Sequence, residues 1–139
     1  MREIKFRGKR KGNKEWVYGG LFYCDDTALI VESLRNYEGE ITLEEYYEVD
    51  PETVGQYIGI KDDNDKEIYE SDIICIREFN SLDWEVYQVK YHGHRDYPAF
   101  DTEPTIDCDC NGISYATACC NIEKIGNIFD NPELLEVEQ

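Results

Sequence analysis

Long apolar runs are absent from this sequence of 139 residues. Its first residues, Met-Arg-Glu-Ile-Lys-Phe, contain no apolar stretch of signal-peptide length, and no later run approaches the length that spans a membrane. We therefore expect a cytoplasmic protein with no membrane partner. Thiols stay reduced in the cytosol, so the six cysteines are not expected to form a disulfide framework.

Basic residues are few compared with acidic ones. Fourteen Lys and Arg stand against 31 Asp and Glu, which gives a net charge of −17, and a field of that sign repels nucleic-acid phosphates and anionic lipids. Residues 1–20 are the exception, with seven basic and two acidic residues. This basic arm predicts a solvated hairpin lying against acidic neighbours, with nucleic-acid binding through Lys9, Arg10 and Lys11 as the alternative.

Helix signals are also few, whereas short apolar or aromatic runs separated by polar turns recur along the chain. Because the runs are rich in Ile, Val and Tyr, they suit half-buried strands. Strands are predicted at residues 4–6, 15–23, 27–33, 54–60, 72–78, 84–92 and 121–129, with a hairpin turn at 11–14. Residues 95–118 lack periodicity and are expected to form a long irregular loop.

Two short helical turns are predicted from capping residues. Asp50 stands before Pro51 in the first, near residues 50–54, and Asn131 stands before Pro132 in the second, near residues 131–136. Many short strands with little helix favour a mainly β fold, as a small barrel or roll. No repeat, linker or low-complexity segment divides the chain, so we expect residues 1–139 to form a single domain.

The acidic stretch Asp62-Asp63-Asn64-Asp65 raises the question of a metal site. A calcium loop that began at Asp62 would need glycine at its sixth position, where Glu67 stands, and helices on both sides, where strand-like runs stand. Asn64 and Asp65 tolerate positive φ better than most residues and suit a tight hairpin turn. We therefore predict a turn between two strands.

The histidines and the late cysteines are the alternative metal candidates. Two imidazoles, His92 and His94, alternate along one predicted strand and so share a face. Thiolates for zinc would come from Cys108, Cys110, Cys119 and Cys120. The spacings Cys-x-Cys and Cys-Cys differ from the Cys-x2-Cys of zinc knuckles, so buried or idle thiols are the other interpretation.

A catalytic set is missing from the sequence. Nucleophilic catalysis needs Cys or Ser beside a base, and nothing in the sequence brings the two histidines near a cysteine. The glycines form no phosphate-binding pattern ahead of a helix. We therefore expect no enzyme, no cofactor and no catalytic residues.

Four segments resemble the YopX protein family of phages and prophages. They are "MREIKFRG", "NKEWVYGGL", "VDPETVGQYIGIKDDNDKEIYESDII" and "EKIGNIFDNPELLE". The resemblance implies a small, mainly β fold related to SH3-type barrels, and it supplies no catalytic residues. The chain departs from the family's usual sequence at Asn64-Asp65 and at Ser71. If Ser71 occupies a glycine position with positive φ, its backbone is expected to shift or to carry modest strain.

These observations favour a non-enzymatic accessory protein of a phage or prophage that binds a protein or assembles with itself. Its acidic body could act as a decoy that imitates a phosphate surface toward a host protein. The alternatives are a zinc-binding protein that uses His92, His94 and the late cysteines, and nucleic-acid binding through the basic N-terminal hairpin.

Overall fold

The structure is a computed structural model that describes residues 3–94, 97–106 and 111–136, with the backbone alone for residues 92–94 and 97–98. It is mainly β, as predicted, and its strands form two antiparallel sheets. The chain separates into two compact units, Met1–Gly59 and Ile60–Gln139. The expectation that residues 1–139 act as a single domain stays a prediction.

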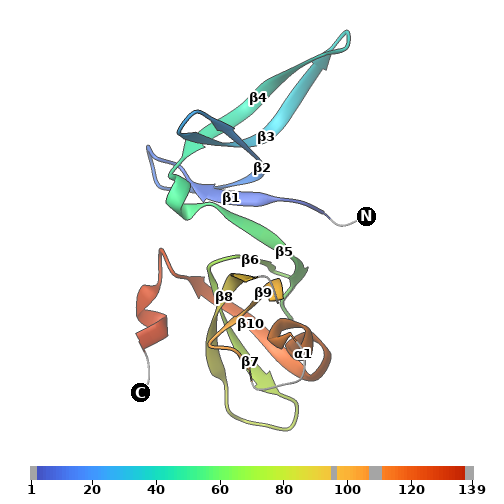
Figure 1. The fold of residues 1–139 in the computed structure, drawn as a ribbon, viewed down its shortest axis with the longest axis vertical. Coiled ribbons are helices and arrows are strands. Elements are labelled where there is room, and N and C mark those ends of the chain that lie inside the picture. The colour runs from blue at the N-terminus through green and yellow to red at the C-terminus, as the bar shows by residue number, and fades with distance from the viewer. Residues whose placement is uncertain (1–2, 95–96, 107–110, 137–139) are drawn as a thin grey trace. The chain divides into compact units, whose positions relative to one another are not determined.

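The first unit consists of one bent sheet (Figure 1). Its elements are β1 (Phe6–Lys9), β2 (Trp16–Cys24), β3 (Thr27–Tyr37), β4 (Glu40–Val49), η1 (Pro51–Thr53) and the first part of β5 (Gly55–Lys61). The strand order is β4-β3-β2-β1-β5, and β4 is an edge strand. The β3–β4 hairpin extends well beyond the other strands of this unit.

The bend in the sheet lies at Gly19, where β2 changes partner. Residues 16–19 pair with β1, and residues 20–24 pair with β3. A Cβ at Gly19 would lie 2.1 Å from the carbonyl oxygen of Val31, so only glycine allows this close approach. The bent sheet encloses a small apolar core of Val17, Ala28, Ile30 and Val49.

The sheet does not close into the small barrel or roll that the sequence predicted. An isolated bridge between Arg10 and Val49 brings the end of β4 beside the residue that follows β1. Elsewhere in the described part of the chain the strands pair in linear order, and β4 beyond this bridge pairs with β3 alone. The mainly β prediction is confirmed, and the SH3-type barrel is not.

The second unit is a four-stranded sheet with one helix. Its elements are β6 (Glu67–Tyr69), β7 (Asp72–Glu78), β8 (Glu85–His94), β9 (Tyr97–Glu103), α1 (Gly112–Cys119), β10 (Cys120–Asn127) and η2 (Pro132–Glu136). Strand β6 is not part of this four-stranded sheet, because it pairs with β5. The order β10-β7-β8-β9 places β7 inside the sheet. Its consecutive residues Ile73, Ile74 and Cys75 are all buried, as expected for a strand that is covered on both faces.

Both predicted helical turns are present. The Asp50 side chain accepts a hydrogen bond from the backbone N–H of Glu52 at 3.0 Å, with Pro51 in the first turn. The second turn, η2, begins at Pro132 as expected. Asn131 plays a different part from the predicted cap, because its side-chain oxygen accepts a hydrogen bond from the N–H of Asn127 at 3.3 Å.

The prediction of an irregular loop at residues 95–118 was wrong. This stretch contains β9, which pairs with β8, and the helix α1. Asn111 caps the helix, because its side-chain oxygen accepts from the N–H groups of Ile113 and Ser114. Strand β4 was also missed in the sequence, because its many glutamates obscure the apolar alternation of an edge strand.

Candidate functional site

The acidic stretch at residues 62–65 forms a turn, as predicted. The turn is wider than the tight two-residue form, since the N–H of Asp62 donates to the carbonyl of Lys66 and the N–H of Asp65 donates to the carbonyl of Asp62. Asp65 has a φ of 67°. Asp62 is buried, and its Oδ1 accepts hydrogen bonds from the N–H groups of Asn64 and Lys66 at 2.9 and 2.8 Å.

Asp62 and its neighbour Asp63 accept hydrogen bonds from backbone N–H groups along the edge of strand β10. The N–H of Lys124 donates to Asp62 Oδ2 at 2.9 Å, and the N–H of Ile122 donates to Asp63 Oδ2 at 3.1 Å. Burial raises the pKa of Asp62, but the N–H donors of Lys124, Lys66 and Asn64 outweigh it and hold the pKa below its ordinary value. The carboxylates of Asp62 and Asp63 accept hydrogen bonds from backbone N–H groups. The acidic stretch at residues 62–65 therefore has a structural role.

The sequence-predicted zinc ligands fall in three places. His92 and His94 lie on β8, where only the backbone is described, and Cys108 and Cys110 lie outside the described residues. Cys119 is exposed at the end of α1, and Cys120 is buried at the start of β10. In the described part of the chain, no group of three or more His, Cys, Asp or Glu residues is arranged to hold a metal ion. Zinc binding stays a prediction.

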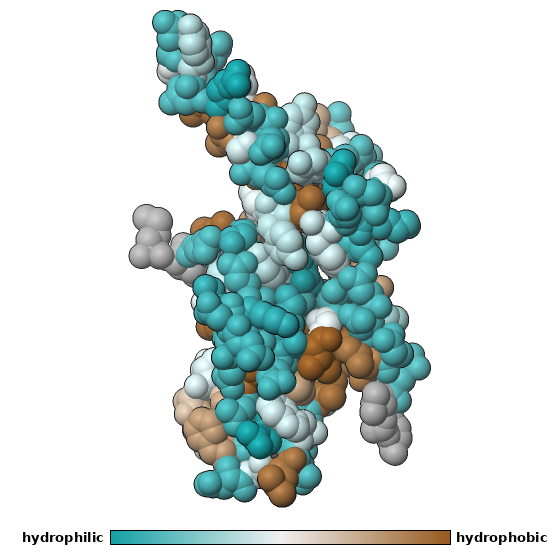
Figure 2. Space-filling model, turned by 180° about the vertical axis from the view of Figure 1, so that it is seen from behind, coloured by the Kyte–Doolittle hydropathy of each residue, from teal (hydrophilic) through white to brown (hydrophobic). Residues whose placement is uncertain are grey.

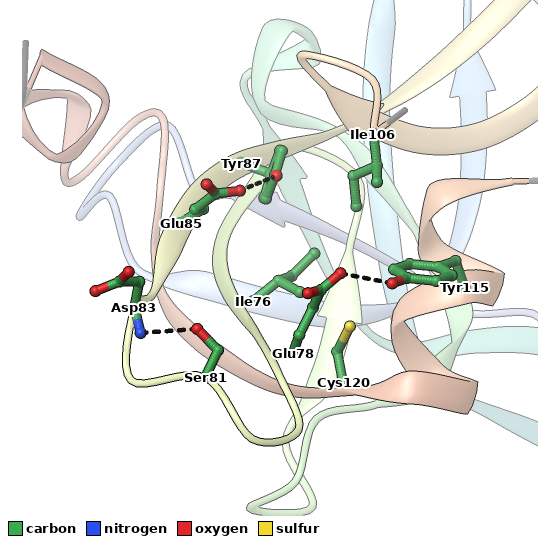
Figure 3. Close-up of a pocket in the computed structure, with 9 residues that line it drawn as sticks. All are labelled: Ile76, Glu78, Ser81, Asp83, Glu85, Tyr87, Ile106, Tyr115 and Cys120. Carbon is green, nitrogen blue, oxygen red and sulfur yellow. Dashed lines mark hydrogen bonds between the residues drawn. The ribbon is translucent and has the colours of Figure 1, made fainter. Parts of the chain in front are cut away.

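A pocket in the second unit was not predicted from the sequence (Figure 3). It has a volume of about 250 Å³. The lining residues come from β7, the following loop, β8, the segment after β9, α1 and β10, and they are Ile76, Glu78, Ser81, Asp83, Glu85, Tyr87, Ile106, Tyr115 and Cys120. Because they are scattered over the second half of the chain, no local motif indicates them.

Two tyrosine–glutamate pairs dominate the chemistry of this pocket. In Figure 3 the hydroxyl of Tyr115, on α1, points toward Glu78, to which it donates a hydrogen bond at 2.6 Å. The hydroxyl of Tyr87 donates to Glu85 at 2.8 Å. The hydrogen bond to Glu78 raises the pKa of Tyr115 to about 12, and burial together with Glu85 raises the pKa of Tyr87. Both phenols are therefore protonated donors at neutral pH.

The Cys120 thiol in the pocket is poorly suited to act as a nucleophile. Its pKa is raised, first by burial and then by the negative charge of Glu78, which disfavours the reactive thiolate. Among the described residues, the nine that line the pocket include no histidine that could serve as a base. The carboxylates of Glu78, Asp83 and Glu85 favour a cationic group over an anionic one in this pocket.

The basic arm lies against aromatic and acidic side chains of its own unit. The guanidinium of Arg10 lies 4.3 Å from the centre of the Tyr47 ring, and that of Arg7 lies 4.4 Å from the Trp16 ring. Lys11 Nζ forms an ion pair with Glu48 Oε2 at 3.1 Å. The Lys11–Glu48 ion pair agrees with the predicted acidic neighbours, whereas the Arg7 side chain is buried and not solvated as predicted.

The β3–β4 hairpin presents an apolar face to solvent. Leu34 pairs directly with Leu43, and Ile41 lies two residues from Leu43, so all three side chains lie on one face. The opposite face is polar. There Ser33 Oγ contacts Glu45 at 3.3 Å and Glu44 at 3.4 Å, and Arg35 forms an ion pair with Glu44 at 3.2 Å.

The apolar face continues onto the neighbouring strands. Glu44 and Glu45 both point to the polar side, at a bulge, so the residues on either side of them, Leu43 and Tyr46, point to the apolar side. Tyr46 pairs with Val31, and Phe22 pairs with Leu29, two residues away from Val31. The hairpin face is therefore made by Phe22, Leu34, Ile41, Leu43 and Tyr46, which are 40–63% exposed.

Contiguous exposed apolar side chains of this kind mark interaction surfaces. In Figure 2 the visible side of the projecting hairpin is mostly hydrophilic, and a few hydrophobic residues show beside it. The sequence contains the signal for this face, because Ile41 and Leu43 alternate with polar residues.

Among the described residues, no helix has the length and the apolar character that crossing a membrane requires.

Comparisons with known proteins identify a family and a fold. The family described as "YopX: YopX protein" matches residues 5–136. Among solved structures, the "Crystal structure of protein EF1440 from Enterococcus faecalis" is similar, with a TM-score of 0.66 and 24% identity over 97% of this chain and 99% of that chain. Identity at this level shows a shared fold alone. The search of curated proteins gave no match.

Proposed function

The chain belongs to the YopX protein family, as its match over residues 5–136 shows, and on that premise we propose that it is a non-enzymatic accessory protein of a phage or prophage that acts in the cytoplasm by binding another protein. The observation that carries this proposal is the hairpin face. Five large apolar side chains, each at least 40% exposed, share one side of a sheet. Burying such side chains against a partner stabilises a complex by about 25 cal/mol for each Å² of apolar surface removed from water.

The alternative of an enzyme receives less support from the pocket. Its thiol has a raised pKa, and its two tyrosine hydroxyls already donate to glutamates. A general acid or base is most effective when its pKa lies near the working pH. The pKa values of Cys120, Tyr87 and Tyr115 are all raised, which takes them further from neutral pH. The non-enzymatic proposal rests on this chemistry as well as on the hairpin face.

A decoy is the more specific form of the proposal. The charge of −17 supports it, because a dense array of carboxylates can imitate a phosphate surface toward a DNA-binding protein. Lys11 and Arg10 are engaged with Glu48 and Tyr47, which supports a protein partner over nucleic acid. A decoy would lose its partner at high salt, because screening weakens contacts between exposed charges.

Affinity purification from a bacterial lysate tests the proposal. The wild-type chain is compared with the variant Leu34→Ser/Ile41→Ser/Leu43→Ser, at low and at high salt. We expect at least one bacterial protein to be recovered with the wild type and not with the variant. If recovery of every protein is the same for the two chains, the hairpin face is not a binding surface.

A further inference from the structure

The charge around the hairpin face indicates what kind of partner fits it, given the protein-binding function proposed above. Residues 25–48 contain eight acidic residues and one basic residue, Arg35, which gives this segment a charge of −7. Arg35 forms an ion pair with Glu44 at 3.2 Å, and Lys11 forms an ion pair with Glu48 at 3.1 Å. Six more carboxylates of the segment therefore add to the negative field around the apolar side chains.

A second copy of this chain fits this surface poorly. Two copies joined through the hairpin face would bring two segments of charge −7 together, on chains that each carry −17. Pairing through β4 would be opposed as well. The strand carries Glu40, Glu44, Glu45 and Glu48, and like charges across paired strands are destabilising, while charges on an edge strand disfavour edge-to-edge pairing.

We infer that the hairpin face binds a different protein, whose contact surface combines an apolar strip with flanking Lys or Arg side chains. The strip would cover Leu34, Ile41 and Leu43. The apolar and acidic faces belong to the same two-stranded hairpin, so long basic side chains beside the strip reach carboxylates such as those of Glu40 and Glu45. Complementary charge at the rim speeds encounter and excludes acidic partners.

Binding of two synthetic peptides to the full-length protein tests whether the hairpin face prefers a basic partner. Both carry the same apolar residues at alternate positions, flanked by lysines in one peptide and by glutamates in the other, and their binding is measured by fluorescence anisotropy. The lysine-flanked peptide is expected to bind the wild type at least about tenfold more tightly than the glutamate-flanked one. It is also expected to bind at least about tenfold less tightly to Leu34→Ser/Ile41→Ser/Leu43→Ser.

Matched variants show whether peptide binding depends on the hairpin face or only on the overall negative charge of the chain. Glu40→Gln/Glu45→Gln removes two charges from the hairpin, and Glu133→Gln/Glu136→Gln removes two exposed charges from η2. Phe79→Ser/Leu82→Ser removes exposed apolar side chains from the second unit. Only the hairpin variants are expected to weaken binding of the lysine-flanked peptide by more than about threefold.

The results distinguish failure of the basic-partner inference from failure of the protein-binding proposal. Equal binding of both peptides, lost in the triple serine variant, would overturn the basic partner and leave the protein-binding face standing. Binding that is the same for the wild type and the triple variant, or no binding up to about 1 mM, would overturn both. A dimer detected by light scattering and abolished by the triple variant would replace the foreign partner with a second copy.

Discussion

The carboxylate of Asp62 accepts a hydrogen bond from the backbone N–H of Lys124, with 2.9 Å between Asp62 Oδ2 and the nitrogen. The two residues are 62 positions apart, and Asp62 Oδ1 at the same time accepts from Asn64 and Lys66. One buried carboxylate thus closes its own turn and satisfies the edge of β10. A residue type that suggests a metal ligand in the sequence serves here as a connection within the second unit.

We predict that Asp62→Asn destabilises the protein. An amide keeps one acceptor oxygen for the turn but places an NH2 group against the N–H of Lys124 or of the turn, which leaves a buried donor unsatisfied. The expected loss is about 2 kcal/mol in the free energy of unfolding. Urea unfolding followed by circular dichroism measures it. Asp65→Asn is the control, since the Asp65 side chain is exposed, and its loss should stay below about 0.5 kcal/mol.

The effect of Asp62 is expected to depend on pH. Its pKa in the folded protein lies below the ordinary value of 3.8, so its contribution to stability is fully present above that value and is lost as the pH falls through the folded pKa. The difference in unfolding free energy between the wild type and Asp62→Asn should therefore be larger at about pH 6 than at about pH 3. A difference that is equal at both pH values would contradict the lowered pKa.

Ser71 has a φ of 77°, in the region that favours glycine. Its backbone is held there, because its N–H donates to Val89 and its carbonyl accepts from Ile128. We predict that Ser71→Gly raises the free energy of unfolding by about 1 kcal/mol, since glycine adopts this φ without strain. Ser71→Ala keeps a Cβ and should give no gain. Equal stabilities of the serine and glycine forms would argue against strain at this corner.

The position of Ser71 illustrates what could be read from the sequence. Its departure from the family's usual sequence raised the condition that Ser71 occupies a glycine position with positive φ, and its φ of 77° meets that condition. The turn at residues 62–65 and the cap at Asp50 were predictable for the same reason, because each depends on residues that are neighbours in the chain.

Features that depend on distant residues could not be read in this way. The Asp62–Lys124 contact joins two segments whose closeness comes from the order of the strands, and the pocket draws its lining from six separate segments. The openness of the sheet also depends on pairings between residues that are distant in the chain. The short alternating runs of a barrel and of an open sheet look alike in sequence, and the edges of the sheet depend on pairings between strands.

Cysteine reactivity should follow burial. Cys24 is exposed, whereas Cys75 is buried and its pKa is raised, first by burial and then by the charge of Glu123. The thiolate is the reactive form, so iodoacetamide at neutral pH should modify Cys24 at least about tenfold faster than Cys75. Peptide mapping by mass spectrometry measures both rates in one sample, and the urea-unfolded chain is the control in which the two rates should converge. Similar rates in the folded protein would contradict the burial of Cys75.

The outer part of the β3–β4 hairpin should be the least protected strand structure of the first unit. Beyond Val31, β3 pairs only with β4 among the described residues, and a two-stranded ribbon is marginally stable in water. We predict that amides of residues 34–43 exchange with deuterium at least about a hundredfold faster than those of Ile73–Ile76, in the buried strand β7. Hydrogen-exchange mass spectrometry compares the two segments. Equal protection would mean that the hairpin is covered in the isolated protein, in which case its apolar face would not be available to a partner.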